Sequence, residues 1–101
     1  MAIIELSVVP IGTPTTSLSQ YVAGAVRILR DEPDIKYELT AMGTIIEGDL
    51  ERLLPLVHRM HHSAFDAGVM RVVTVVKSDE RRDKASSISS KMESVKQKLR
   101  Q

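Results

Sequence analysis

Acidic and hydroxyl side chains suited to binding a small molecule concentrate in the stretch KYELTAMGTIIEGD, residues 36–49. Apolar and polar residues alternate in its first half, which predicts a half-buried strand with Glu38 and Thr40 on the polar face. A β-branched run after Gly43 predicts a second strand, so that the two form an antiparallel hairpin. We expect Thr44 to add a hydroxyl close to this polar face. Such a face suits a small polar or cationic ligand, and it suits plain solvation equally well.

Carboxylates on neighbouring strands also raise the question of catalysis. Glu5, Glu38 and Glu47 are candidates for a general acid and base, because strand carboxylates can approach each other across a sheet. No sequence motif places a histidine or a serine beside them, and neither Ser7 nor Ser17 lies in a known nucleophile pattern. Solvated or salt-bridged carboxylates explain the same residues. We therefore expect a binding protein and not an enzyme.

Three histidines stand close together in a predicted helix. His58 and His62 are four residues apart, a spacing that can place two imidazoles on one metal ion. A zinc site needs three or four protein ligands, and the sequence fixes no others nearby. His61 faces the apolar side of the helix, which favours a partly buried structural role. Glycine-rich phosphate loops are also missing, since Gly43 and Gly48 are isolated turn residues. We expect no metal and no cofactor.

The run VMRVVTVVK at 69–77 has the strongest strand propensity in the chain, and both of its faces are largely apolar. This pattern favours a strand that is central in a sheet or covered by an interface. Arg71 interrupts the run, and an arginine in such a strand needs an anionic partner. Glu38 and Glu47 are the candidates. The alternating charges at 79–84 favour a solvated segment or ion pairs between subunits.

The composition narrows the class of protein. At 101 residues the chain is expected to form one domain, residues 1–101. A formal net charge of +1 and only three aromatic residues disfavour a nucleic-acid partner. The absence of cysteine excludes disulfides and thiol chemistry. No apolar stretch approaches the ~20 residues that cross a bilayer, and the first ten residues do not resemble a signal peptide. We expect a cytoplasmic location without membrane contact.

The predicted elements alternate in the order β-α-β-β-α-β-α. Pro10 is expected to end the first strand, and Ser17 to open the first helix in a capping box with a glutamine three residues later. Asp49 is the expected N-cap of the second helix. Pro55 within that helix predicts either a kink or a regular part that begins near Leu54. A third helix is expected from about residue 87 to the C-terminus.

This order predicts an α+β fold, the ferredoxin-like βαββαβ sandwich, with a four-stranded antiparallel sheet and an extra C-terminal helix. Both crossover helices cover one face of such a sheet and leave the other face open. Ile3, Val9 and Ile45 are expected on the open face, together with part of the 70–76 run. A small domain with an apolar open sheet usually pairs with a copy of itself, so we expect a homo-oligomer.

Several short motifs together resemble the thiamine-binding YkoF-like family, the DUF77/UPF0045 group. The similarity extends over nearly the whole chain, in order and without large gaps. The motifs are SVVPIGT at 7–13, SLSQYV at 17–22, KYEL at 36–39, MGT at 42–44, IEGD at 46–49, AG at 67–68, RVV at 71–73, Asp79, RRDK at 81–84, and Lys91, Ser94 and Val95.

The resemblance implies a ferredoxin-like sandwich in dimers that assemble into tetramers, and non-catalytic binding of thiamine or its hydroxymethylpyrimidine part. A carboxylate can pair with the thiamine cation or its amino group, hydroxyls can satisfy ring nitrogens, and a thioether or a tyrosine can pack on a ring. The candidate ligand-binding residues are Ser7, Ser17, Tyr37, Glu38, Thr40, Met42, Thr44 and Glu47.

Two other functions remain open alongside thiamine binding. One is a structural or regulatory homo-oligomer whose open sheets only pair, without a thiamine site, and the other is an enzyme. The sequence does not distinguish thiamine from its phosphates or its pyrimidine precursor. Phosphate esters are less expected, because no anion-binding loop is visible.

Overall fold

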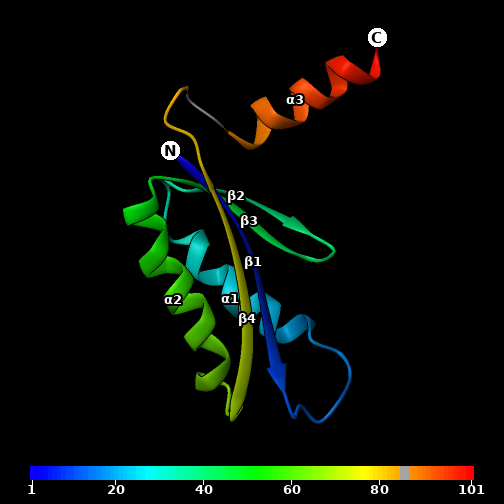
Figure 1. Cartoon of the computed structure of the whole chain (residues 1–101). Helices are drawn as coiled ribbons and strands as arrows, with labels where there is room; N and C mark the ends of the chain where they lie inside the picture. Colours follow the sequence, from blue (N-terminus) through cyan, green and yellow to red (C-terminus); the bar gives the residue numbers. More distant parts are fainter. Residues whose placement is uncertain (85–86) are drawn as a thin grey trace.

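Figure 1 shows the computed structural model of the chain, which describes residues 1–84 and 87–101. These residues form four strands and three helices in the predicted order, which confirms the α+β, ferredoxin-like fold with an additional C-terminal helix. The elements are β1 (Ala2–Ile11), α1 (Ser19–Arg30), β2 (Lys36–Thr40), β3 (Gly43–Gly48), α2 (Leu50–Asp66), β4 (Arg71–Glu80) and α3 (Ile88–Leu99).

The sheet has the strand order β2-β3-β1-β4, and neighbouring strands are antiparallel. β1 is central along its first half, where Ile4 lies between Ile46 of β3 and Ser78 of β4. β4 is an edge strand, so the interpretation of its apolar run as a central strand is wrong. Its second apolar face lies on the open side of the sheet, with Val73 and Val75 exposed. The alternative, a strand covered by an interface, stays a prediction.

Two sequence-based boundaries near the first helix are corrected. Pro10 does not end β1, because it pairs with Val72 at a point where the pairing with β3 has already stopped. Among the described strands, β1 therefore has only one neighbour there, which leaves room for a residue without an N–H. Ser17 does not cap α1, which begins after Leu18, and its hydroxyl lies 3.4 Å from that of Ser19.

α2 is continuous from Leu50 to Asp66 with Pro55 inside it, so, of the two predicted alternatives, the late start near Leu54 is wrong, while the kink stays a prediction. Asp49 occupies the N-cap position as predicted, although its side chain makes no capping hydrogen bond. Burial on the sheet holds this helix together despite the missing backbone donor.

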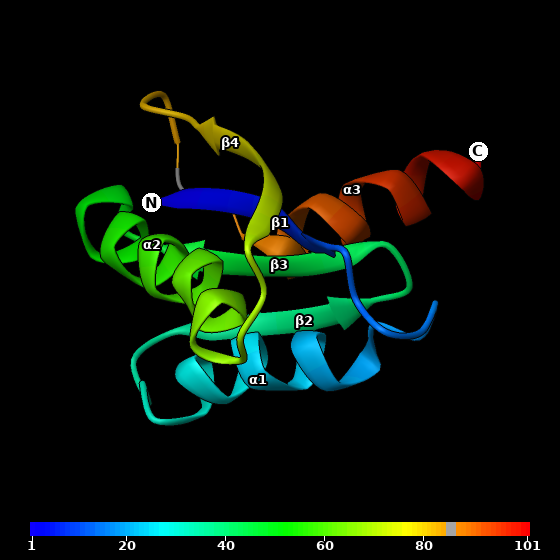
Figure 2. The ribbon, with the colours of Figure 1, turned by 90° about the horizontal axis from the view of Figure 1, so that it is seen from below.

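The core lies between the sheet and α2, with α1 packed beside α2 on the same face of the sheet (Figure 2). Leucines and a methionine at helical spacing on α2 meet the alternating apolar residues of β1 and β3. The largest fully buried side chains are Ile4, Leu6, Leu29, Ile46, Leu53, Leu56 and Met60. None of the described helices combines the length and apolar character that crossing a bilayer requires.

The hairpin turn fixes which side chains share a face. Thr40 pairs with Gly43, so Thr44 pairs with Leu39 and, on its other side, with Leu6. The expected position of Thr44 near Glu38 is therefore wrong, since Thr44 belongs to the helix-covered face and is only 5% exposed. The strand register, and not the residue type, decides on which face of the sheet Thr44 lies.

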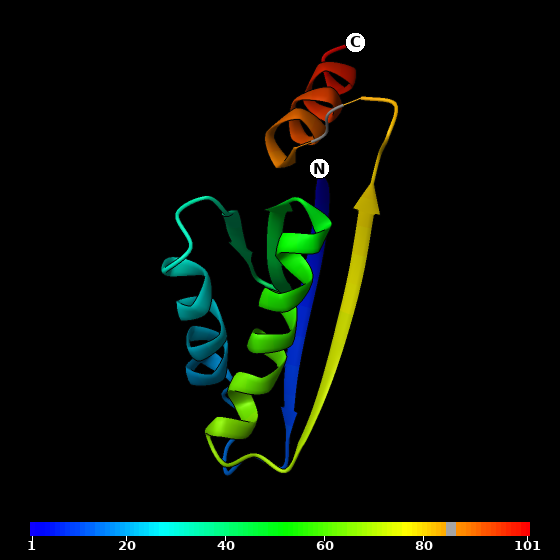
Figure 3. The ribbon, with the colours of Figure 1, turned by 90° about the vertical axis from the view of Figure 1, so that its left-hand side faces the viewer.

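α3 extends beyond the end of the sheet, away from α1 and α2 (Figures 1 and 3). Ser87 caps it in a reciprocal capping box with Ser90, which explains why the helix starts there. The helix buries no side chain, and Met92, Val95 and Leu99 are exposed. Its apolar stripe is therefore formed but not covered by the described part of this chain.

Two glycines provide a test of the sheet geometry. A Cβ at Gly43 would lie 2.7 Å from the backbone oxygen of Leu6, whereas a Cβ at Gly24 in α1 would meet nothing within 4 Å. We expect Gly43→Ala to lower the free energy of unfolding by about 1–3 kcal/mol, because β1 and β3 must separate. Gly24→Ala should raise it by about 0.5–1 kcal/mol through helix propensity. Urea denaturation at one protein concentration measures both, and equal stabilities of the two variants would contradict the register.

Candidate functional site

A cleft of about 950 Å³ separates α1 from the β2–β3 hairpin. It exists because α1 packs on α2 through Ala25 and Leu29 and does not cover the edge of the sheet. As a result Tyr37 and Leu39 of β2 are 39% and 57% exposed, although they lie on the helix side. Figure 2 shows α1 alongside β2, with the two elements running in opposite directions.

The wall and floor of the cleft are mainly apolar. On α1, Leu29 is buried in the core, whereas Val22, Ala25 and Val26 line the cleft. Small residues such as Ala23 keep the helix side open. The remaining apolar lining residues are Leu6, Val8, Leu18, Leu39, Ala41 and Met60, and Val9 borders the cleft from the open-face side of β1.

The cleft brings together the predicted binding residues Ser7, Tyr37, Thr40, Met42 and Thr44. Thr40 already has a structural task, because its hydroxyl donates to the Gly43 oxygen (2.8 Å) and accepts from the Gly43 nitrogen (3.1 Å). Met42 is 86% exposed at the tip of the hairpin.

Other predicted residues lie elsewhere. Glu38 pairs with Ile45 on the open face of the sheet, opposite to the cleft, and Ser17 precedes α1 without lining the cleft. Three polar residues of the cleft escaped the sequence analysis: Ser19, Arg27 and Arg30. Their only signal was a position on the flank of an amphipathic helix, which does not reveal that the flank faces a cavity.

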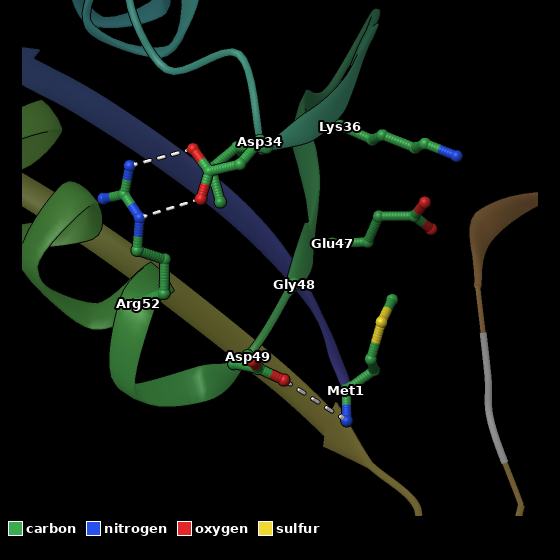
Figure 4. Close-up of a pocket in the computed structure, with 8 residues that line it drawn as sticks. Met1, Asp34, Lys36, Glu47, Gly48, Asp49 and Arg52 are labelled. Carbon is green, nitrogen blue, oxygen red and sulfur yellow. Dashed lines mark hydrogen bonds and ion pairs between the residues drawn. The ribbon is translucent and has the colours of Figure 1, made fainter.

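A second, smaller pocket of about 340 Å³ lies where β2 begins and β3 ends (Figure 4). Asp34 and Arg52 face each other there through two hydrogen bonds of 3.1 Å, and the Arg52 guanidinium holds the pKa of Asp34 below its ordinary value of 3.8. The amino group of Met1 lies 3.9 Å from Asp49. These charges are already matched, so the pocket offers little to a ligand and mainly ties the loop before β2 to α2.

Glu47 also lines this pocket, but its carboxylate points to the other side of the hairpin (Figure 4). The residue is only 6% exposed, and its Oε2 accepts a hydrogen bond of 2.6 Å from the backbone N–H of Ile88. A second contact joins Lys91 of α3 to Asp79 of β4, and the Lys91 ammonium lowers the pKa of Asp79. Glu47 and Asp79 thus attach the first turn of α3 to the sheet.

His61 and Arg71 show how the register settles two hypotheses. His61 is half-buried and its Nδ1 lies 2.6 Å from the Thr74 hydroxyl, which confirms a structural role. Arg71 pairs with Ile11, at the opposite end of β1 from Glu47, and Glu38 lies on the far edge strand. The predicted pairing of Arg71 with Glu38 or Glu47 is therefore wrong.

Comparison with known proteins decides the family. The sequence profile described as "Thiamine-binding protein" matches residues 4–96. The chain belongs to the thiamine-binding protein family. It is 44% identical over 102 residues to the UPF0045 protein YqgV of Bacillus subtilis, which covers 98% of each chain. It is also 45% identical over 96 residues to a UPF0045 protein of Methanothermobacter thermautotrophicus, covering 94% of this chain and 96% of the relative.

A solved structure supports the same assignment. The crystal structure of MJ1052 from Methanocaldococcus jannaschii superposes with a TM-score of 0.85 at 36% identity, covering 93% of this chain and 94% of that chain. The resemblance inferred from the sequence motifs is thereby confirmed. The family is named for binding and not for a reaction, and the matched residues include both the cleft and Glu47.

The contact between Glu47 and α3 predicts how this family member responds to substitution. Glu47→Ala removes the acceptor of the Ile88 N–H, and amide hydrogen exchange at Ile88 should become about tenfold faster or more, as loss of a charge-assisted hydrogen bond implies. Glu47→Gln keeps an acceptor oxygen and should exchange more slowly than Glu47→Ala. The matched control is Glu38→Ala on the same face, which should leave exchange in α3 unchanged. Identical exchange in all variants would show that Glu47 does not hold the helix.

Proposed function

We propose that this protein binds thiamine, or a related hydroxymethylpyrimidine-type molecule, in the cleft between α1 and the β2–β3 hairpin, and that residues 1–101 act as one binding domain. Carrier, salvage and sensing roles all require such reversible binding. The observation that carries the proposal is a large apolar cleft with few polar groups in a member of a family named for thiamine binding. Its volume lies within the range of about 300–1,000 Å³ typical of small-molecule sites.

The side chains of the cleft suit a flat, partly polar ring. Tyr37 offers an aromatic face, and valines of α1 offer an apolar wall on the opposite side. The hydroxyls of Ser19 and Thr44 can donate to or accept from ring nitrogens and an amino group. We assign ligand contacts to Tyr37 and Thr44, a turn-forming role to Thr40, and an outer position to Met42. Ser7 borders the cleft, but its side chain belongs to the open face, because Ser7 pairs with Val75.

Binding without turnover agrees with the chemistry of the cleft. Its lining residues, as far as the chain is described, include no carboxylate, histidine or lysine. A general acid or base with a pKa near neutrality is therefore not among them. Glu5 of β1 and Glu38 of β2 lie on the other face of the sheet, where they flank Ile45 of β3.

A titration with thiamine tests the cleft. Ala23→Trp places an indole in the cleft from α1 and should weaken thiamine binding by about tenfold or more, because it occupies the volume of the ligand. Gln20→Trp adds the same group to the same helix outside the cleft and should bind as the unaltered protein does. Isothermal titration calorimetry measures both affinities. Equal binding by the two variants would move the site elsewhere, and no binding by the unaltered protein at millimolar thiamine would refute the function.

We further propose that the open face of the sheet pairs with a second copy of the chain, in a homo-oligomer assembled as a dimer of dimers. Val73 and Val75 are exposed there at 43% and 61%, and Val73 pairs with Val9 of the central strand, which also carries Ile3 on this face. A net charge of only +1 gives two copies little reason to repel each other. The exposed apolar stripe of α3 adds a further uncovered surface beyond the end of the sheet.

Assembly is tested separately from ligand binding. Val75→Glu places a charge in the proposed interface and should shift the assembly equilibrium by about tenfold or more towards smaller species, because desolvating an unpaired carboxylate is costly. The control Ala67→Glu adds the same charge at an exposed position after α2. Sedimentation over a range of concentrations compares them. An assembled Val75→Glu variant would contradict pairing through this face, whereas assembly without thiamine binding would favour the structural or regulatory alternative.

A further inference from the structure

The charge of the cleft differs from what thiamine alone would require. Arg27 and Arg30 are the only charged side chains among its described lining residues, and no carboxylate lines it. Thiamine carries a positive thiazolium ring, so it would enter a site whose only formal charges repel it. A ligand that brings an anionic group would find two guanidinium groups instead.

The two arginines lie at one end of the cleft. They are three residues apart in the last turn of α1, which places them on neighbouring positions of one helix face. Ser19, at the first turn, marks the other end, close to the hairpin tip and its hydroxyls. The rise of 1.5 Å per residue separates Ser19 from Arg27 by roughly 12 Å along the helix. The cleft therefore has a hydroxyl end and a cationic end, joined by an apolar middle.

Neither arginine forms an ion pair with the described residues of the chain. No carboxylate lies within salt-bridge distance of Arg27 or Arg30 in the part of the chain that the structure describes, whereas Arg52, Arg59, Arg81 and others there have such partners. Cations near a helix C-terminus also stabilise the helix dipole, which is a sufficient reason for basic residues in the last turn. That effect does not account for two arginines that line one cavity whose described lining residues include no carboxylate, and their full charges exceed the partial charge of the helix end.

We propose that the ligand of this cleft is a phosphate ester of the thiamine type, with its phosphate bound by Arg27 and Arg30 and its pyrimidine at the hydroxyl end. This rests on the proposed function and specifies the chemical form of the ligand. A guanidinium presents a planar fork of donors that matches phosphate oxygens, so no glycine-rich loop is needed. Phosphate esters were less expected from the sequence because it contains no anion-binding loop, but arginine side chains can bind a phosphate without such a loop.

The test compares thiamine, thiamine monophosphate and inorganic pyrophosphate by calorimetry on the whole protein. We expect thiamine monophosphate to bind about tenfold tighter than thiamine at low salt, and the difference to shrink as salt screens the charges. The double variant Arg27→Gln/Arg30→Gln should abolish that difference and leave thiamine binding no weaker. Arg82→Gln/Arg100→Gln removes the same charge away from the cleft and should keep the difference. Circular dichroism checks that both variants are folded.

The outcomes separate this inference from the proposed function. Equal binding of thiamine and its monophosphate, or a difference that persists without Arg27 and Arg30, overturns the phosphate site while thiamine binding stands. Pyrophosphate that binds as tightly as the ester, and only with both arginines present, supports the anion site but refutes ring recognition. Failure of all three ligands to bind refutes both.

Discussion

The packing of α1 against α2 is the constraint on which the candidate site depends. Ala25 and Leu29 of α1 belong to the same buried core cluster as the apolar residues of α2. Because this contact fixes α1 at a distance from the edge strand, Tyr37 and Leu39 keep accessible surface on the side that a helix normally covers. When a ligand buries apolar surface of this kind, the hydrophobic free energy gained is roughly 25 cal/mol per Å². The cleft therefore offers a ligand apolar surface that the fold itself leaves uncovered.

The hairpin tolerates this arrangement because it does not rely on α1 for its position. β3 is bonded to both β2 and β1, and Ile46 is buried under α2. The close approach of Gly43 to the Leu6 backbone lets the two strands meet without a side chain between them. The hairpin therefore keeps its position without support from α1, and the cleft between the two elements persists.

The alternation of β-strand side chains divides the proposed functions between two faces. Thr44 and Tyr37 point to the helix side, where the cleft lies, whereas Glu38, Val73 and Val75 point to the open side. The proposed ligand binding and the proposed self-association thus use opposite faces of the sheet. Glu47 belongs to the open side, where its buried carboxylate holds the first turn of α3 and leaves the apolar stripe of that helix available to a partner.

Periodicity in the sequence was sufficient for the order and type of the elements, since apolar spacing of two or of three to four residues directly reflects which side chains are buried. It was insufficient wherever the answer depended on register. Thr44 changed faces because of the length of a turn, Arg71 lost its proposed partner because of strand order, and the apolar run around it proved to be an edge strand.

The sequence alone therefore determined the family, the ferredoxin-like fold and the hydroxyl-rich hairpin as a candidate binding element. Only the tertiary structure decided that Tyr37 and Thr44 share a cleft, that Glu47 holds a helix, and that Arg27 and Arg30 line the same cleft. The physical reason is that burial is recorded locally, in the pattern of each element. Which two elements leave a space between them depends on how helices and strands pack, and that is a property of the whole chain.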